Sequence, residues 1–246
     1  MITPRVTGAV AVRVLTQVRR DRRTAAMLLV LPCLLITLMW WMFLDSFGDP
    51  FNRFGPALLA MFPFIVMFLV TSVTTLRERS SGTLERLLAM PMGKLDFLLG
   101  YAVAFGIVAA VQATLAVTVS VGLLGLDIQG SVLLLGVVAV ADAVLGSALG
   151  LFVSAFAQTE FQAVQFLPLI VFPQILLCGL FVPRDTLPGV LRAASDVLPL
   201  SYAVDAMQHV ASSADTGDAW LDVLVVVAYA VAGLALGALT LRRQTA

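Results

Sequence analysis

The sequence predicts an all-α integral membrane protein whose single domain, residues 1–246, contains six transmembrane helices. Two observations predict this fold class. The chain is 60% hydrophobic and only 12% charged, whereas an ordinary soluble domain carries about 25% charged residues. Six apolar runs also reach the length of about 20 residues that a helix needs to cross a bilayer. These runs lie at about 25–44, 54–76, 96–124, 131–156, 163–181 and 219–241.

The distribution of positive charge predicts that both termini lie in the cytoplasm, an N-in/C-in topology. Twelve of the fifteen Lys and Arg residues precede the first run, separate the second from the third, or follow the sixth. Only Arg53, Arg184 and Arg192 fall on the other side, together with most of the aspartates.

Residues 5–23, ahead of the first run, predict an N-terminal interfacial helix. Val6, Val10, Val14 and Val18 recur every four residues, and Arg13 lies on a different face. This pattern is typical of an amphipathic helix in the headgroup region, with its basic residues near anionic lipid. The alternative is that these basic residues only keep this end of the chain in the cytoplasm, as the positive-inside rule describes. The basic residues at the end of this segment are Arg19, Arg20, Arg22 and Arg23.

A second short helix is predicted at 82–90, in the inner loop between the second and third runs. Ser81 or Gly82 can cap it and Pro91 ends it. Three leucines share one face, and so short a helix cannot bury that face against itself. It therefore lies on the bilayer surface or in the groove of a partner protein. The leucines are Leu84, Leu87 and Leu88.

The outer segment 183–211 is too apolar for a solvated loop and too short to span. Pro183, Pro188 and Pro199 divide it, with helices expected at about 188–198 and 200–211. This pattern predicts a re-entrant or surface-lying helical hairpin on the outer side.

Asp142 lies near the middle of the fourth run, where an acidic residue often marks function. One interpretation is a proton relay. Gly146 and Gly150 follow at intervals of four, which indicates a packing face of small residues. We favour this structural role for Asp142.

Ser201, Asp205 and His209 also recur every four residues, and they superficially resemble a hydrolase triad. Side chains spaced along one helix face cannot converge on one substrate atom, so we predict no catalytic residue. No His/Cys pair has the spacing of metal ligands, so no metal site is predicted either.

Taken together, these motifs resemble those of the type-2 ABC export permeases. The inner loop carries Arg77-Glu78-Arg79, then Gly82-Thr83-Leu84-Glu85-Arg86-Leu87-Leu88 and Pro91. The outer segment carries Cys178-Gly179-Leu180-Phe181-Val182-Pro183 and Leu198-Pro199-Leu200-Ser201-Tyr202-Ala203-Val204-Asp205. The chain is most similar to single-domain, daunorubicin-resistance-like permeases. Family members often carry a basic residue shortly after the last Asp. Here Met207, Gln208 and His209 follow, which weakens the case for an outer charge pair.

The resemblance implies a membrane-spanning exporter subunit that moves bulky apolar or amphipathic compounds across a bacterial cytoplasmic membrane. The chain has no phosphate-binding loop, because Gly93-Lys94 is followed by Leu95. ATP and Mg would therefore be bound by separate ATPase subunits, with no cofactor on this chain. The other implied partners are membrane lipid and a second permease copy or a sister permease; no nucleic acid is expected. The alternative is export of polysaccharide or cell-envelope lipid, and a non-transporting scaffold or membrane enzyme is less favoured.

The same resemblance assigns candidate residues. The ATPase-coupling helix would use Gly82, Leu84, Glu85, Arg86, Leu87 and Leu88. The second and fifth spans would line the substrate path with Phe62, Phe64, Met67, Phe68, Thr71, Gln165, Phe166, Phe172 and Gln174.

Overall fold

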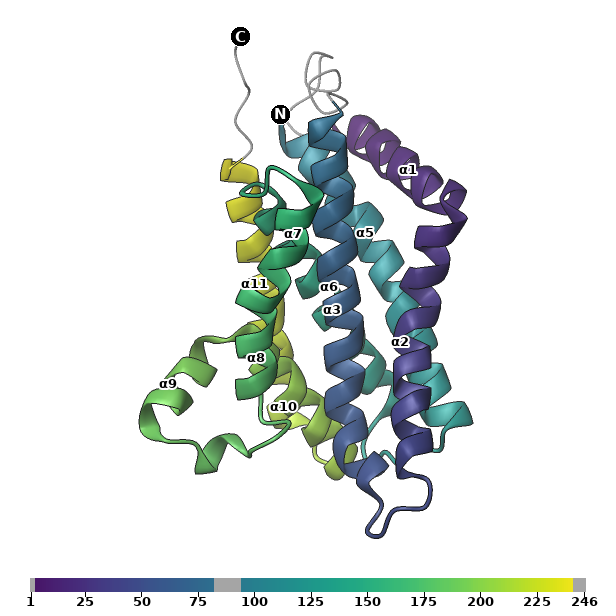
Figure 1. The fold of residues 1–246 in the computed structure, drawn as a ribbon, viewed down its shortest axis with the longest axis vertical. Coiled ribbons are helices and arrows are strands. Elements are labelled where there is room, and N and C mark those ends of the chain that lie inside the picture. Colours follow the sequence, from purple (N-terminus) through teal and green to yellow (C-terminus); the bar gives the residue numbers. More distant parts are fainter. Residues whose placement is uncertain (1–2, 82–93, 241–246) are drawn as a thin grey trace.

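A computed structural model describes residues 3–81 and 94–240 of the chain. Its regular elements within these ranges are helical, and six helices are long and apolar enough to cross a membrane (Figure 1). The predicted fold class is therefore confirmed. The six candidate spans are Arg22–Phe43, Pro50–Ser80, Leu99–Leu123, Val132–Ser154, Glu160–Leu177 and Gly217–Gly237.

The bundle has two chemically different ends. One end carries α1 (Pro4–Arg20), the start of α2 (Arg22–Phe43) and the end of α3 (Pro50–Ser80). We name it the basic end. The opposite end carries α9 (Gly189–Val197) and α10 (Pro199–Ser212), with Asp185, Asp196 and Asp205. We name it the acidic end. The predicted charge separation is thus present in three dimensions, while its orientation across a membrane stays a prediction.

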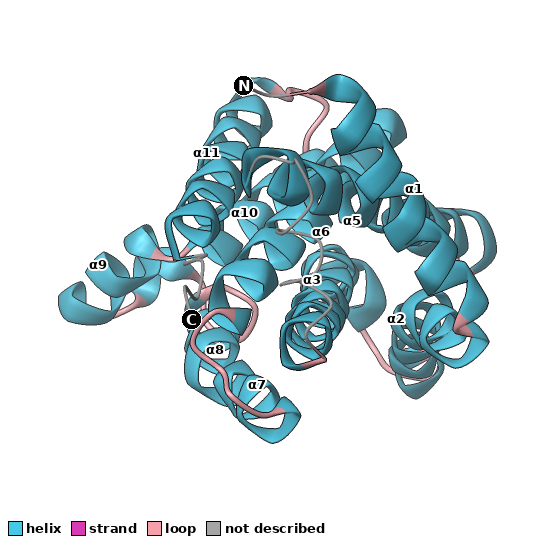
Figure 2. Ribbon diagram, turned by 90° about the horizontal axis from the view of Figure 1, so that it is seen from above, coloured by secondary structure: helices cyan, strands magenta, loops and turns pink. Residues whose placement is uncertain are grey.

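Helix α3 is the central element of the bundle. It packs along α6 (Val132–Ser154), and both lie near the middle when the bundle is viewed end-on (Figure 2). The contact is close because glycines face it: a Cβ on Gly146 would lie 2.5 Å from the carbonyl oxygen of Phe64. Gly150 makes the same contact with Phe68 one turn further on. The two glycines of the predicted packing face therefore lie against α3.

The third and sixth spans complete the bundle around this pair. Helix α5 (Lys94–Val117) continues into a π-helical turn, Thr118–Leu123. Helix α11 (Gly217–Thr240) packs on α6 and α10.

The fifth span is built from three pieces rather than one regular helix. Helix α7 (Glu160–Phe166) is followed by a π-helical turn, Leu167–Val171, and by α8 (Phe172–Leu177). Pro168 and Pro173 lie in this stretch, and proline cannot donate the backbone hydrogen bond that a regular helix requires. The helix ends before Gly179, whose φ of +91° turns the chain. The span consequently ends four residues earlier than the sequence predicted.

Helix α1 is amphipathic, as its valine spacing predicts. Val10 and Val14 are buried, and Val6 and Val18 are partly buried against the same core. The chain passes from α1 into α2 at Asp21, whose carboxylate accepts hydrogen bonds from the hydroxyl and backbone N–H of Thr24. These bonds cap α2 and lower the pKa of Asp21. The location of α1 in a headgroup region remains a prediction.

The outer segment forms the two helices that the proline pattern predicts. Helix α10 packs against α11, α3 and α6, with Leu200, Val204 and Met207 fully buried. A 3-10 turn, Arg184–Thr186, precedes α9. Helix α9 projects from the bundle (Figure 2) and exposes Val190 and Val197. The re-entrant character of this hairpin stays a prediction.

Candidate functional site

Three consecutive charged residues end α3 at the basic end of the bundle: Arg77, Glu78 and Arg79. Successive residues of an α-helix point about 100° apart, so three neighbours point in three directions. Each of these side chains contacts a different part of the bundle, and together they anchor the last turn of α3.

Arg77 connects α3 to the start of the fifth span. Its Nε and Nη2 donate to the two carboxylate oxygens of Glu160, at 2.7 and 2.9 Å. The side chains of Arg77 and Glu160 are 58% and 50% exposed. Because solvent screens such a pair, its contribution to stability is small, and its bidentate geometry mainly fixes orientation.

Glu78 connects α3 to α1. Its carboxylate lies 3.2 Å from Nη2 of Arg13, and the residue is only 4% exposed. A buried carboxylate without a partner would be strongly destabilising. The position of Arg13 is therefore coupled to the folding of the α3 end.

Arg79 connects α3 to the end of α6. Its Nη1 donates to the backbone carbonyl of Ser154, the last residue of α6. A cation near the C-terminus of a helix interacts favourably with the helix dipole. All three anchors lie within five residues of the segment where the coupling helix is predicted.

The six predicted coupling residues, Gly82 to Leu88, lie outside the described residues. The four arginines at the end of the predicted interfacial helix (connecting helix), Arg19, Arg20, Arg22 and Arg23, are described and exposed, at the turn between α1 and α2. None of them forms an ion pair with another described residue.

The path candidates on α3 are mostly inside the bundle. Phe64, Met67, Phe68 and Thr71 have no exposed surface, and only Phe62 is partly exposed. Phe64 and Phe68 lie where α3 contacts the glycines of α6. In this conformation these four side chains form part of the core of the chain.

The candidates on the fifth span are more accessible. Gln165 and Phe172 are exposed and Phe166 is partly exposed. No described residue hydrogen-bonds the Gln165 amide, although an amide facing hydrocarbon is costly. Gln174 differs, because it is buried, donates to the carbonyl of Ile170 at 3.1 Å and accepts from the backbone N–H of Leu200 at 3.3 Å. It therefore joins α8 to the first turn of α10.

Asp142 lies in the middle of α6 with no exposed surface. Neither of its carboxyl oxygens has a hydrogen-bond partner among the described residues. The neighbouring Ser147 donates to the carbonyl of Ala143 in its own helix.

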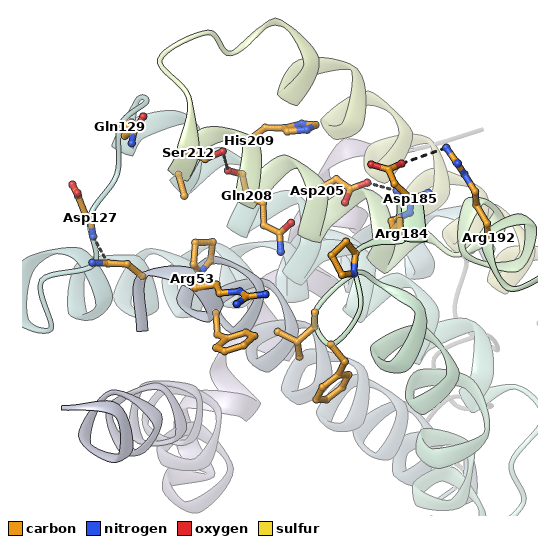
Figure 3. A pocket seen from close by; sticks show the side chains of 18 of the residues that line it. Arg53, Asp127, Gln129, Arg184, Asp185, Arg192, Asp205, Gln208, His209 and Ser212 are labelled. Carbon is orange, nitrogen blue, oxygen red and sulfur yellow. Dashed lines mark hydrogen bonds and ion pairs between the residues drawn. The ribbon is translucent and has the colours of Figure 1, made fainter. Parts of the chain in front are cut away.

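A polar pocket of about 780 Å³ opens at the acidic end, between the start of α3 and the α8–α10 segment (Figure 3). Its organising cation is Arg184, which pairs with Asp205 and, at 2.6 Å, with Asp196. Burial lowers the pKa of Arg184, but the two carboxylates more than offset this effect and raise it overall. The guanidinium also stacks over the Tyr202 ring, 5.3 Å from its centroid.

Arg184 is a residue of this pocket that the sequence alone did not single out as a candidate. From the sequence alone Asp205 had no expected basic partner, because no Lys or Arg follows it closely. Its partner precedes it by 21 residues. The turn at Gly179 returns the chain toward α10, and a Cβ there would lie 3.4 Å from Cγ of Arg184.

Ser201, Asp205 and His209 do not converge. Ser201 is hydrogen-bonded to Ser195 at 3.1 Å, Asp205 pairs with Arg184, and Nδ1 of His209 lies 3.3 Å from Asp222. Their partners belong to three different segments, so the arrangement serves packing between α9, α10 and α11. Within residues 3–81 and 94–240, no group of His, Cys, Asp or Glu could hold a metal ion.

Comparison with known proteins gives a family match over most of the chain. The model of the family described as ABC-2 type transporter matches residues 5–211. This range includes the Arg77–Arg79 anchors and all but one terminal residue each of α1 and the α9–α10 hairpin.

Several curated proteins are similar to the chain. ABC transporter G family member 20 of Dictyostelium discoideum is 24% identical over 205 residues, which cover 80% of this chain and 28% of that protein. The probable multidrug ABC transporter permease YbhR of Escherichia coli (strain K12) is 31% identical over 63% of this chain and 42% of its own length. The probable permease YbhS of the same strain is 27% identical over 62% and 41%. The chain thus spans less than half the length of these relatives.

Proposed function

The chain belongs to the ABC-2 type transporter family, and on that premise we propose that it is the membrane-spanning subunit of an ATP-driven exporter. Its cargo is a bulky apolar or amphipathic compound. The energy comes from a separate ATPase subunit that binds ATP and Mg. Two similar proteins from Escherichia coli carry the description of probable multidrug permeases, which supports this class of cargo.

The observation that carries the proposal is the anchoring of the α3 end by Arg77, Glu78 and Arg79. Each pairs with a different part of the bundle, directly before the predicted coupling helix at 82–90. A force applied to this segment by an ATPase is thereby distributed to α1, α6 and α7 together. An isolated surface loop would dissipate the same force in local motion.

The coupling helix contacts the ATPase through its apolar face. Leu84, Leu87 and Leu88 enter a groove on the ATPase, while Glu85 and Arg86 form ion pairs at the rim. Of the two possibilities that the sequence leaves open, the proposal thus favours a protein groove over the bilayer surface. It requires the basic end of the bundle to lie in the cytoplasm, and the positive-inside rule supports that orientation.

The substrate path runs along the accessible face of the fifth span. Gln165, Phe166 and Phe172 lie on that face, and Phe62 is the accessible candidate on α3. Flat aromatic surfaces suit apolar cargo of varied shape. The Gln165 amide, which no described residue hydrogen-bonds, gains a partner there, either from cargo or from a second permease copy. The buried candidates on α3 reach the path only if α3 separates from α6.

Reconstitution with the partner ATPase tests the proposal. The purified pair is placed in liposomes of bacterial cytoplasmic-membrane lipids, and ATP hydrolysis is measured with a panel of amphipathic drugs, glycolipids and polysaccharides. We expect stimulation by amphipathic drugs. We also expect Leu87→Asp to abolish this stimulation in a protein that still folds.

The matched control is Thr16→Asp, which adds the same charge at an exposed position of the basic end and leaves stimulation intact. Two results contradict the proposal. Normal stimulation of the Leu87→Asp variant overturns the docking role of the coupling helix. Stimulation by polysaccharide or glycolipid alone assigns the alternative cargo.

A further inference from the structure

Helix α1 contacts both helices that lead into and out of residues 82–93. One of these helices is the end of α3 and the other is the start of α5. The sequence separations are 65 residues for Arg13 and Glu78 and 93 residues for Thr3 and Asp96. A single N-terminal helix therefore connects the two supports of this segment.

The contact with α3 is an ion pair in a protected place. The side chain of Glu78 is 5% exposed and that of Arg13 is 34% exposed. Val10 and Val14, on the same helix as Arg13, are buried. Because water is largely excluded around Glu78, the attraction between the two charges is less screened than on an open surface, and removal of one partner leaves the other charge poorly solvated.

The contact with α5 places a carboxylate at the N-terminus of α1. Asp96, in the first turn of α5, accepts a hydrogen bond from the backbone N–H of Thr3 at 2.7 Å. The same oxygen accepts from the Thr7 hydroxyl at 3.1 Å. Asp96 is 1% exposed. A carboxylate at this position satisfies a free N–H group and interacts favourably with the helix dipole.

The backbones of α1 and α5 also approach closely beside Asp96. A Cβ on Gly100 would lie 2.6 Å from Cβ of Val10 and 3.0 Å from the carbonyl oxygen of Thr7. One turn after Asp96, the two helices are thus in direct contact. Any shift of the α5 start must carry α1 with it.

We propose that α1 is a strap that holds the α3 and α5 supports of the coupling segment in a fixed relative position. Arg13, Glu78 and Asp96 are positioning residues for energy transfer. This inference rests on the proposed function, because it assigns α1 a role in that same coupling. Since α1 passes into α2 at Asp21, a displacement of the strapped supports is also transmitted to the first span.

Charge exchange between Arg13 and Glu78 tests the strap. The variants are Arg13→Glu, Glu78→Arg and the double exchange, with Glu78→Gln in case the arginine variant does not fold. The control is Arg5→Glu on the same helix, since Arg5 is exposed and forms no ion pair with a described residue. We measure ATPase binding, cargo-stimulated ATP hydrolysis, and hydrogen exchange of residues 77–81 and 94–98 in the permease alone.

We expect each single exchange to reduce stimulated hydrolysis about tenfold, with little change in ATPase binding, and to speed amide exchange in both supports. The double exchange restores hydrolysis and protection, whereas Arg5→Glu changes neither. A general folding defect would reduce binding as well, and the double exchange would not repair it.

The outcomes separate the strap from the proposed function. If the wild-type permease stimulates no ATPase, the proposed function fails, and the exchange measurements alone decide whether α1 holds the two supports. If the wild type is stimulated and Glu78→Gln and both single exchanges behave like wild type, the strap is wrong.

Discussion

Gly146 of α6 lies against the carbonyl oxygen of Phe64 of α3, so close that a Cβ on Gly146 would be 2.5 Å from that oxygen. The two most buried helices of the bundle thus meet backbone to backbone at this point. Small residues permit such an approach, which replaces side-chain packing by dispersion contacts along the helix axes. The position tolerates no larger residue without separation of α3 and α6.

We expect Gly146→Ala to destabilise the protein by about 1–3 kcal/mol, because overpacking at a rigid backbone contact forces the two helices apart. The measurement is reversible unfolding in detergent micelles. Gly136→Ala is the matched control on the same helix, since a Cβ there meets nothing within 4 Å. Alanine favours a helix more than glycine does, so the control is expected to be neutral or stabilising. Equal effects at the two positions would contradict the close contact.

The Arg184 network predicts unequal costs for two arginines of the same pocket. Arg184→Gln removes the cation from beside Asp205, whose side chain is only 25% exposed, and we expect a loss of about 3 kcal/mol. Arg192→Gln breaks a 3.4 Å pair with Asp185 in which both side chains are more than half exposed. That change is expected to cost about 0–1 kcal/mol. Similar unfolding midpoints for the two variants would show that Arg184 does not organise the hairpin.

Asp205 predicts a specific pH dependence. Burial raises its pKa above the ordinary value of 3.8, and Arg184 and His209 reverse the shift only in part. A carboxyl group with a raised pKa binds its proton more tightly in the folded state. Its contribution to stability is therefore fully present below the unfolded value and is lost as the pH rises through the folded value.

The Asp205→Asn variant isolates this effect, because it removes one titrating group and leaves the others in place. The difference in unfolding temperature, wild type minus variant, is expected to be larger near pH 4 than near pH 7. The unfolding temperatures of the wild type and of the variant are measured in the same detergent at both pH values. A difference that shrinks on acidification would mean that the pairing with Arg184 outweighs burial.

The sequence predicted the elements that depend on local pattern. Composition predicts the six spans, the spacing of apolar residues predicts the amphipathic α1, and the prolines predict the divided hairpin. Each of these signals acts over neighbouring residues. The sequence did not predict which side chains meet across the bundle. Arg13 and Glu78 are 65 residues apart, and Arg184 precedes Asp205 by 21, so no local spacing reveals either pair.

The direction of side chains on α3 was also beyond sequence reasoning. Aromatic and Met residues occur all around this helix, so its pattern does not distinguish a face toward α6 from a face toward a path. The backbone atoms of Phe64 and Phe68 lie against the α6 glycines, and both side chains are fully buried. Gln174 illustrates the same limit, since its amide joins α8 to α10, a contact set by the turn at Gly179.

Asp142 offers the sharpest distinction between a structural and a functional acid. Its carboxyl group is fully buried and has no hydrogen-bond partner among the described residues. An isolated charge at such a site would be very costly. We therefore expect Asp142→Asn, which keeps the shape and removes the ionisable group, to fold at least as stably as the wild type and to transport at a similar rate.

Ser147→Ala is the control, because it removes a polar group from the same helix, and the hydrogen bond of that group stays within α6. Folding is measured by unfolding in micelles and transport by cargo accumulation in inside-out vesicles. If Asp142→Asn is folded and inactive while Ser147→Ala transports normally, the acid takes part in the transport cycle. A proton-exchanging role would then replace the structural one, since the amide keeps the size and shape of the acid but cannot release a proton.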